Sequence, residues 1–481
     1  MNKETLDFSE RDFEALLVKS NEMVLNQFKD LEHLKGYHDH PQAIVESWFD
    51  ETLPSKGMNV FELLEEVESK VLKTATGNLG PHMYAYVMSG GNQISIIAEK
   101  LATTINQNQT KWHLGPAMNE IEKRVIAWTA EMLDFPKESG GVLVSGGSAA
   151  NLTGLTVGRN IFFEELGIRK KGLFGQKPFV VYGSEEVHSC IDKSVELLGI
   201  GSNHLRKIST NSFFQIDLNK LTQQIKTDIE AGLKPFCIIG NAGTVNTGAI
   251  DDLDALAKLA QKYGLWYHID GAYGALAGIL DSLKTEYKGM EKADSIALDF
   301  HKWLYQPFEG GCTLVRSWAN LKRTYYKKAA YLDTELANDG NRLEFNEHYF
   351  QLSRNAKAFK VWMSIKAYGM DHIKAMIQKD IDLTDYLNKL INNSADFELV
   401  ASSKLAVSCF RYVGNMTTKK EITKFNKRLI PALEKDGRVF IMGTQLKGEY
   451  AIRACLINHR KTKDSLDFLL EVIRDVAQKL E

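Results

Sequence analysis

Between residues 120 and 315, short apolar runs alternate with stretches of helical spacing, and this alternation restricts the fold more than any other feature of the chain. One helix is delimited clearly, because Asp251 or Asp252 is a suitable N-cap and Gly264 a suitable C-terminal stop. Short apolar strands separated by helices predict an α/β fold with a mostly parallel sheet that is covered on both faces. The expected strands cover residues 141–144, 178–182, 235–239, 265–269 and 295–300.

The flanking regions have other patterns. The first 80 residues or so are expected to be helical, with an apolar stripe from Phe61 to Val71, until Gly77, Gly80 and Pro81 end it. The C-terminal region is expected to form a small α/β domain from about residue 370. Its expected elements are helices near 355–392 and 419–435, a strand over 405–412 and a last helix over 466–480.

The length and composition are those of a soluble protein of two or three domains. The chain has 481 residues, of which 44% are hydrophobic and 25% charged. Lysine plus arginine (59) nearly balances aspartate plus glutamate (61), which argues against nucleic-acid and membrane partners. The five cysteines have no C-x-x-C spacing, so no metal site is expected. The cysteines are expected to be reduced thiols. Without a signal-peptide core or a bilayer-length apolar run, a cytoplasmic protein is expected.

Two charged residues follow neighbouring apolar runs. Asp270 follows the run 265–269, and Lys302 follows the run 295–300. Ligands of open α/β sheets bind at the carboxyl ends of strands, so both side chains are expected in one site. A lysine in partly apolar surroundings is a usable nucleophile and can hold an aldehyde cofactor as a Schiff base. Since the aspartate can hold a proton on a ring nitrogen, the pair predicts pyridoxal 5'-phosphate (PLP) as the cofactor.

Two further features fit the same cofactor. The segment 145–152 joins a strand to a helix with two glycines and two hydroxyls, and a helix N-terminus suits a phosphate. It is not a P-loop, because no Gly-Lys-Ser/Thr follows. His188 comes after another expected strand, where an imidazole can stack on a pyridine ring. Each feature alone also fits an ordinary turn, cap or loop residue. The glycine-rich turn, the histidine, the aspartate and the lysine occur in this order, each after an apolar run. Their occurrence together favours PLP.

The motifs HIDGAYG, DFHKWL, GVLVSGGSAANL, SEEVHSCIDKS and GNAGTVNTGAIDDL resemble those of the group II PLP-dependent amino acid decarboxylases. That family includes aromatic-L-amino-acid, glutamate, cysteine sulfinate and 2,4-diaminobutyrate decarboxylases, and the resemblance runs from about residue 40 to the end. It implies a homodimer of the aspartate aminotransferase fold with a shared active site. The implied parts are an N-terminal helical arm swapped in the dimer (1–85), a large PLP-binding domain (86–369) and a small C-terminal domain (370–481).

The resemblance also implies roles for individual residues. Lys302 is the Schiff-base lysine, Asp270 the partner of the pyridinium nitrogen and His188 the stacking base. Tyr331, in AAYLDTE, returns a proton to the substrate carbon, which favours simple decarboxylation over an aldehyde-forming reaction. Thr244 matches a threonine of the family motif. Many members have a second hydroxyl residue directly after it, where this chain has Val245. The implied cofactor-binding residues are Gly147, Ser148, His188, Thr244, Asp270, Ala272, His301 and Lys302.

The substrate is expected to be an L-amino acid, and the sequence does not decide which side chain it carries. The polar residues Asn78, Asn108 and Thr110 favour an acidic or diamino side chain, because a buried polar group has to be matched by the ligand. Aromatic residues at the same implied pocket leave an aromatic substrate equally open. An aminotransferase or an aldehyde-forming relative of the same fold is the alternative activity, and a non-catalytic binding protein is a weaker one. The implied substrate residues are Tyr84, Tyr86, Asn108, Thr110 and Arg354.

Overall fold

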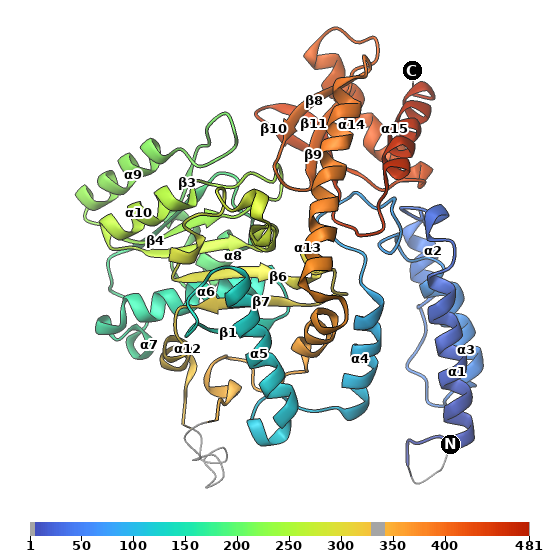
Figure 1. Cartoon of the computed structure of the whole chain (residues 1–481), viewed down its shortest axis with the longest axis horizontal. Helices are drawn as coiled ribbons and strands as arrows, with labels where there is room; N and C mark the ends of the chain where they lie inside the picture. Colours follow the sequence, from blue (N-terminus) through green and yellow to red (C-terminus); the bar gives the residue numbers. More distant parts are fainter. Residues whose placement is uncertain (1–4, 329–341, 481) are drawn as a thin grey trace. The chain divides into compact units, whose positions relative to one another are not determined.

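The computed structural model describes residues 5–328 and 342–480, which belong to two compact units (Figure 1). The larger unit comprises Val87–Asn388 and Ala401–Ser408. The smaller unit comprises Met1–Tyr86, Lys389–Val400 and Cys409–Glu481. The candidate site lies wholly in the larger unit.

A seven-stranded sheet forms the centre of the larger unit, in the order β1-β7-β6-β5-β4-β2-β3. Neighbours from β6 to β3 run parallel, and β7 runs antiparallel to both β1 and β6. The predicted mostly parallel sheet is therefore confirmed. The strands are β1 (Gly140–Val144), β2 (Phe179–Ser184), β3 (Leu205–Ile208), β4 (Lys234–Asn241), β5 (Trp266–Gly271), β6 (Ser295–Asp299) and β7 (Gly311–Val315).

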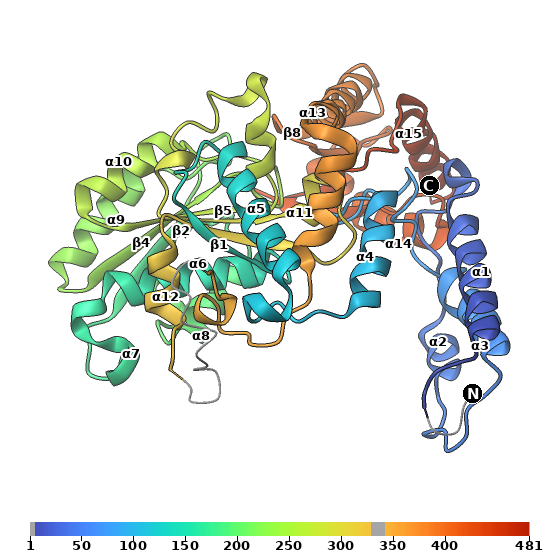
Figure 2. The same ribbon diagram turned by 60° about the horizontal axis from the view of Figure 1, so that its bottom comes forward.

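Helices cover both faces of this sheet, with α6 and α8 on one side and α5 and α10 on the other (Figure 2). The predicted caps of α10 are confirmed, since Asp252 accepts a hydrogen bond from Ala255 N and Gly264 has φ of 62°. The core is apolar where α6 meets the sheet, and Leu155 and Val157 are buried with Val181 and Ile239. The helices are α4 (Gln93–Ile105), α5 (Pro116–Met132), α6 (Gly147–Phe162), α7 (Ile168–Lys171), α8 (Cys190–Leu197), α9 (Leu218–Glu230), α10 (Leu253–Tyr263), α11 (Phe300–Trp303), α12 (Trp318–Tyr325) and α13 (Lys357–Asn392).

Most of a four-stranded sheet, in the order β10-β11-β9-β8, belongs to the smaller unit. Lys447 and Gly448 join β10 to β11, and both have positive φ, as a two-residue hairpin turn requires. None of the helices within 5–328 and 342–480 combines the length and apolar character needed to cross a bilayer. The elements are β8 (Phe397–Ser402), β9 (Val407–Tyr412), β10 (Met442–Leu446), β11 (Glu449–Cys455), α1 (Glu10–Gln27), α2 (Gln42–Ser47), α3 (Val60–Val67), α14 (Lys419–Asp436) and α15 (Lys463–Gln478).

Candidate active site

A cavity of about 630 Å³ opens where β1, β2, β4, β5 and β6 end. The carboxyl ends of parallel strands meet at one edge of a sheet, so residues far apart in sequence converge there. The structure brings all the predicted cofactor-binding residues into the wall of this cavity: Gly147, Ser148, His188, Thr244, Asp270, Ala272, His301 and Lys302.

The turn from β1 into α6 forms one wall. No side chain caps the first turn of α6, so its N–H groups are available to an anion. Gly146 has φ of 154°, which L side chains rarely adopt. A Cβ atom on Gly147 would lie 2.8 Å from Ala272 Cβ and 2.9 Å from Asp299 Oδ2. The close approach of the opposite wall therefore requires glycine at position 147.

Asp270 stands at the end of β5 and is 7% exposed. Its Oδ1 accepts a hydrogen bond from Ala272 N at 3.2 Å, which fixes the carboxylate at the cavity wall. Two residues earlier, the buried His268 bonds Ser295 Oγ and Asn151 Oδ1, each at 2.8 Å. Burial lowers the pKa of His268 to about 4, so the ring is neutral at pH 7. Since Asn151 belongs to α6, these bonds tie the strand that bears Asp270 to the helix that begins at Gly147.

Lys302 lies in α11, directly after β6, and its side chain is 14% exposed. Its Nζ is 2.9 Å from Oδ2 of Asp299, the last residue of β6. The Asp299 side chain is 2% exposed, and its Oδ1 has no hydrogen-bond partner among the described residues. The sequence interpretation did not single out Asp299, although a carboxylate at the end of an otherwise apolar buried run was a signal.

His188 and Thr244 line the cavity from two other loops. Nδ1 of His188 accepts a hydrogen bond from Cys190 N at 3.2 Å, so the neutral ring carries its proton on Nε2. Burial raises the pKa of the Cys190 thiol to about 12, which leaves it protonated. The hydroxyl of Thr244 lies 3.0 Å from Thr247 Oγ1 and accepts from Ala249 N at 3.1 Å. Thr244 therefore also shapes its own turn.

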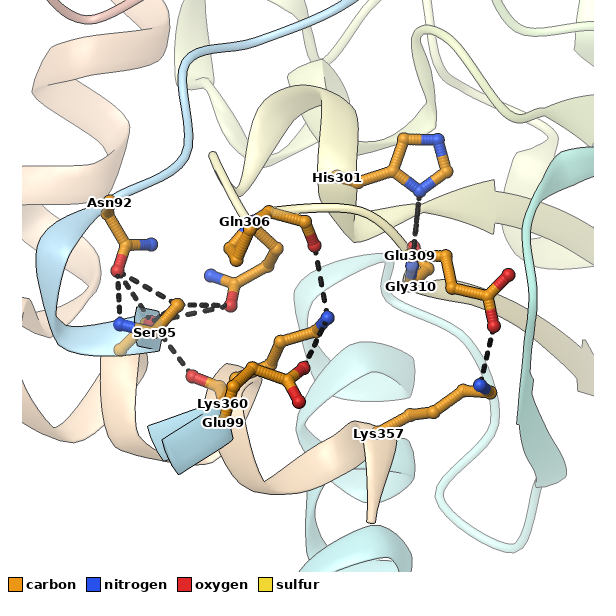
Figure 3. A network of polar contacts seen from close by, with 11 residues as sticks. Asn92, Ser95, Glu99, His301, Gln306, Glu309, Gly310, Lys357 and Lys360 are labelled. Carbon is orange, nitrogen blue, oxygen red and sulfur yellow. Dashed lines mark hydrogen bonds and ion pairs between the residues drawn. The ribbon is translucent and has the colours of Figure 1, made fainter. Parts of the chain in front are cut away.

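The loop 306–310 positions the His301 ring, and side chains of two helices contact and hold this loop (Figure 3). His301 Nδ1 lies 3.1 Å from Gly310 O and 3.2 Å from Gly310 N, and burial lowers the pKa of the ring. From α13, Lys357 pairs with Glu309 at 2.6 Å. Lys360 bonds Pro307 O at 3.0 Å and pairs with Glu99 of α4 at 2.7 Å. These contacts hold the loop that carries Phe308 and Glu309 into the cavity wall.

The predicted substrate residues do not line this cavity. Tyr84 belongs to the smaller unit, where its hydroxyl donates to Ser465 O at 2.7 Å. Tyr86 of the same unit is exposed and has φ of 57°. Tyr331 lies outside the described residues.

Asn108, Thr110 and Arg354 come together elsewhere in the larger unit. Asn108 Oδ1 accepts a hydrogen bond from Arg354 N at 3.1 Å. Thr110, two residues further along the chain, is buried. The Arg354 guanidinium is 1% exposed and pairs with the fully buried Glu122 at 2.5 Å. Arg354 is therefore a core residue in this structure, and its backbone N–H and C=O bond Asn108 and Gln109.

The residues of the cavity fit PLP. Its volume is that of a small-molecule site, and an uncapped helix N-terminus faces it for the phosphate. Lys302 and Asp270 supply the amine and the carboxylate that the aldehyde and the ring nitrogen need. The unpartnered Asp299 Oδ1 also marks a wall built to meet a polar group. Fold and site together define a PLP-dependent enzyme.

Comparison with known proteins identifies the family. Residues 41–413 match the pyridoxal-dependent decarboxylase conserved domain. An aromatic-L-amino-acid decarboxylase of Bacillus atrophaeus is 31% identical over 99% of this chain and 98% of its own. The solved structure of Oryza sativa TDC with PLP and tryptamine has the same fold, with a TM-score of 0.93, 23% identity and 99% of both chains covered. The glutamate decarboxylase domain of a Vibrio parahaemolyticus diaminobutyrate-pyruvate transaminase and L-2,4-diaminobutyrate decarboxylase superposes with a TM-score of 0.87 at 26% identity, over 99% and 97%.

The chain belongs to the pyridoxal-dependent decarboxylase family. It is a PLP-dependent amino acid decarboxylase, and the predicted aspartate aminotransferase fold, cofactor and reaction class are confirmed.

Proposed function

We propose that the chain converts an aromatic L-amino acid to the corresponding amine and carbon dioxide, with Lys302 as the Schiff-base lysine. The observation that carries the reaction is the convergence of Lys302, Asp270 and the uncapped start of α6 on one cavity. The aromatic substrate is supported by the full-length relationship to the Bacillus atrophaeus enzyme. It is also supported by Phe308, an exposed aromatic side chain in the cavity wall whose ring packs against His301.

The residues divide the work among binding, orientation and proton transfer. When bound, PLP accepts the electrons of the bond between the substrate Cα and its carboxylate. Lys302 holds the cofactor through Nζ, and Asp270 keeps a proton on the ring nitrogen. His188 stacks on the ring and Ala272 packs against it, while Tyr331 returns a proton to the substrate carbon. The phosphate is held by the first turn of α6 with Gly147, Ser148 and His301, and Thr244 completes the cofactor site.

A second candidate substrate is a diamino acid. Glu186 lies in the cavity wall, where its carboxylate suits a cationic side chain, whereas Glu309 of the same wall is already paired with Lys357. The Vibrio parahaemolyticus relative, whose printed name includes L-2,4-diaminobutyrate decarboxylase, supports the same candidate.

We also propose a homodimer in which the N-terminal arm (1–85) wraps the partner, next to a large domain (86–369) and a small domain (370–481). The arm has many exposed apolar side chains, as expected of a surface that a partner covers. In such a dimer Tyr84, Tyr86, Asn108 and Thr110 contribute to a shared substrate pocket, and Arg354 fixes the segment that bears the last two. The exposed residues include Phe13, Leu25, Phe49, Leu53 and Phe61.

A cytoplasmic location is proposed because all five cysteines are free and buried, as suits a reducing compartment.

The test is to incubate the purified protein with PLP and single L-amino acids and to identify the products. Aromatic amines and carbon dioxide are expected. Amine from 2,4-diaminobutyrate alone would support the second candidate, and keto acids would indicate an aminotransferase. An aldehyde would indicate an oxidative relative, and no product from any amino acid would indicate a binding protein.

Two matched variants separate the substrate candidates. Phe308→Leu should raise KM for an aromatic substrate more than KM for a diamino acid, because it removes an aromatic ring from the cavity wall. The same ring packs against His301, and the loss of that contact is common to both substrates. Glu186→Gln should raise KM for a diamino acid and leave KM for an aromatic substrate unchanged, because it removes a negative charge at constant shape and leaves the Glu309–Lys357 pair intact.

A further inference from the structure

Asp299 is a buried acid that the proposed mechanism leaves unused. Its carboxylate is 2% exposed, with Oδ2 at 2.9 Å from Lys302 Nζ and 3.6 Å from His301 Nε2. Its Oδ1 is buried and accepts no hydrogen bond from any residue that the structure describes. Burying a half-satisfied carboxylate is costly, so a role at the site is the natural explanation.

The carboxylate also borders the phosphate turn. A Cβ atom on Gly147 would lie 2.9 Å from Asp299 Oδ2, and one on Gly146 would lie 3.9 Å from Oδ1. Asp299 therefore stands between Lys302 and the first turn of α6. Once a phosphate occupies that turn, an ionised Asp299 faces a second anion, and a protonated Asp299 does not.

Lys302 has a requirement that Asp299 can meet. The ion pair is formed by an ammonium and a carboxylate, and an ammonium nitrogen has no lone pair with which to add to an aldehyde. One proton has to leave Nζ before the covalent bond to the cofactor forms. The acceptor has to lie within hydrogen-bond reach of Nζ, and Asp299 Oδ2 does.

We propose that Asp299 accepts this proton and so enables Lys302 to bind the cofactor covalently. The proposal rests on the proposed Schiff base at Lys302. One proton passes from Nζ to Oδ2, and the neutral amine adds to the aldehyde carbon. The aldehyde oxygen then leaves as water with the two remaining amine hydrogens, and a C=N bond results. The Asp299 carboxyl keeps its proton and meets the phosphate as a neutral group.

The other groups that face Asp299 are less suited to this task. His301, on the same short helix, has its Nδ1 engaged with Gly310, and its Nε2 lies 3.6 Å from Asp299. Asp270 from β5 is assigned to the ring nitrogen. The remaining titratable groups of the cavity wall are Glu186 and His188 after β2, Cys190 of α8, Tyr273 after β5 and Glu309 before β7, with Lys360 of α13 behind the loop.

The experiment measures cofactor loading rather than turnover. Apoprotein is mixed with PLP in a stopped-flow instrument, and the visible band of the lysine-bound cofactor is followed. Asp299→Asn should slow this step by at least about 100-fold, the contribution of a positioned proton acceptor. Pyridoxamine 5'-phosphate has no aldehyde, and its dissociation constant should be equal to or lower than in the wild type. Asp192→Asn is the matched control, because it makes the same change in an Asp–Lys ion pair outside the cavity wall, Asp192–Lys207 at 2.8 Å, and it should load at the wild-type rate.

The outcomes separate this proposal from the proposed function. Loading of Asp299→Asn within about threefold of the wild type overturns the role of Asp299, and so does a loss of pyridoxamine phosphate affinity that matches the loss of rate. A wild type that never develops the visible band refutes the Schiff base itself. Asp299→Ala gives a second test, since formate should restore its loading rate by supplying the missing carboxylate. Slow loading without rescue by formate would also contradict the proposal.

Discussion

Gly147→Ala should weaken cofactor binding through one identifiable contact. The added Cβ atom would lie 2.8 Å from Ala272 Cβ and 2.9 Å from Asp299 Oδ2, closer than ordinary carbon contacts of about 3.5–4.0 Å. Overpacking of this kind costs about 1–3 kcal/mol. If the strain is relieved by moving the turn away from its phosphate-binding position, the dissociation constant of PLP rises about 5- to 150-fold.

A double-mutant cycle identifies the contact. Apoprotein is titrated with pyridoxamine 5'-phosphate, so that covalent bonding does not contribute, and the dissociation constants are compared. Ala272→Gly removes the nearer of the two clashing atoms, so Gly147→Ala/Ala272→Gly should recover part of the lost affinity. Unchanged affinity in Gly147→Ala, or no recovery in the double variant, would refute the role given to the tight turn.

Three further predictions concern the site and its supports. Asp270→Ala should keep measurable PLP binding while kcat falls about 10²- to 10³-fold, as measured by carbon dioxide release, because the ring nitrogen loses its partner; near-normal kcat would contradict this role. His268, whose pKa is lowered to about 4 by burial, gives stability that is full above pH 6.5 and is lost as pH falls toward 4. The full loss, reached below pH 4, is about 3 kcal/mol, and about 2 kcal/mol of it falls between pH 7.5 and 5. Urea midpoints of His268→Gln should therefore vary less over this range than those of the wild type, and equal variation would argue against it. Arg354→Met strands the buried Glu122 and should lower the free energy of unfolding by about 3–5 kcal/mol, with partial recovery in Arg354→Met/Glu122→Gln; no recovery would show that the ion pair is not the cause.

Five strands of the larger sheet were predictable because they are buried on both faces. β1, β2, β4, β5 and β6 are wholly or largely buried and therefore appear in the sequence as apolar runs. The edge strand β3 has two partly or fully exposed positions out of four, so it has no such run. In the smaller sheet β10, with the sequence MGTQL, is mostly half-exposed and was missed for the same reason. The apolar β7 was not singled out, although its sequence GCTLV is fully buried.

The site residues divide in a similar way. Those that follow apolar runs, such as Asp270 and Lys302, were predicted because the ends of parallel strands converge. Asp299 was missed because its importance depends on which way the last side chain of β6 points, and this is fixed only by pairing with β5 and β7. The link from His268 to Asn151 joins residues 117 positions apart, and no local pattern predicts it.

The substrate assignments depend on the proposed dimer and on Tyr331, which lies outside the described residues, so they stay predictions.

The most direct test of the account is chemical trapping at Lys302. The protein is incubated with PLP, reduced with borohydride and digested, and the peptides are mapped by mass spectrometry. A pyridoxyl phosphate adduct on the peptide that contains Lys302, and its disappearance in Lys302→Ala, is the expected result. An unmodified Lys302 peptide, or an adduct at another lysine in active protein, would contradict the account.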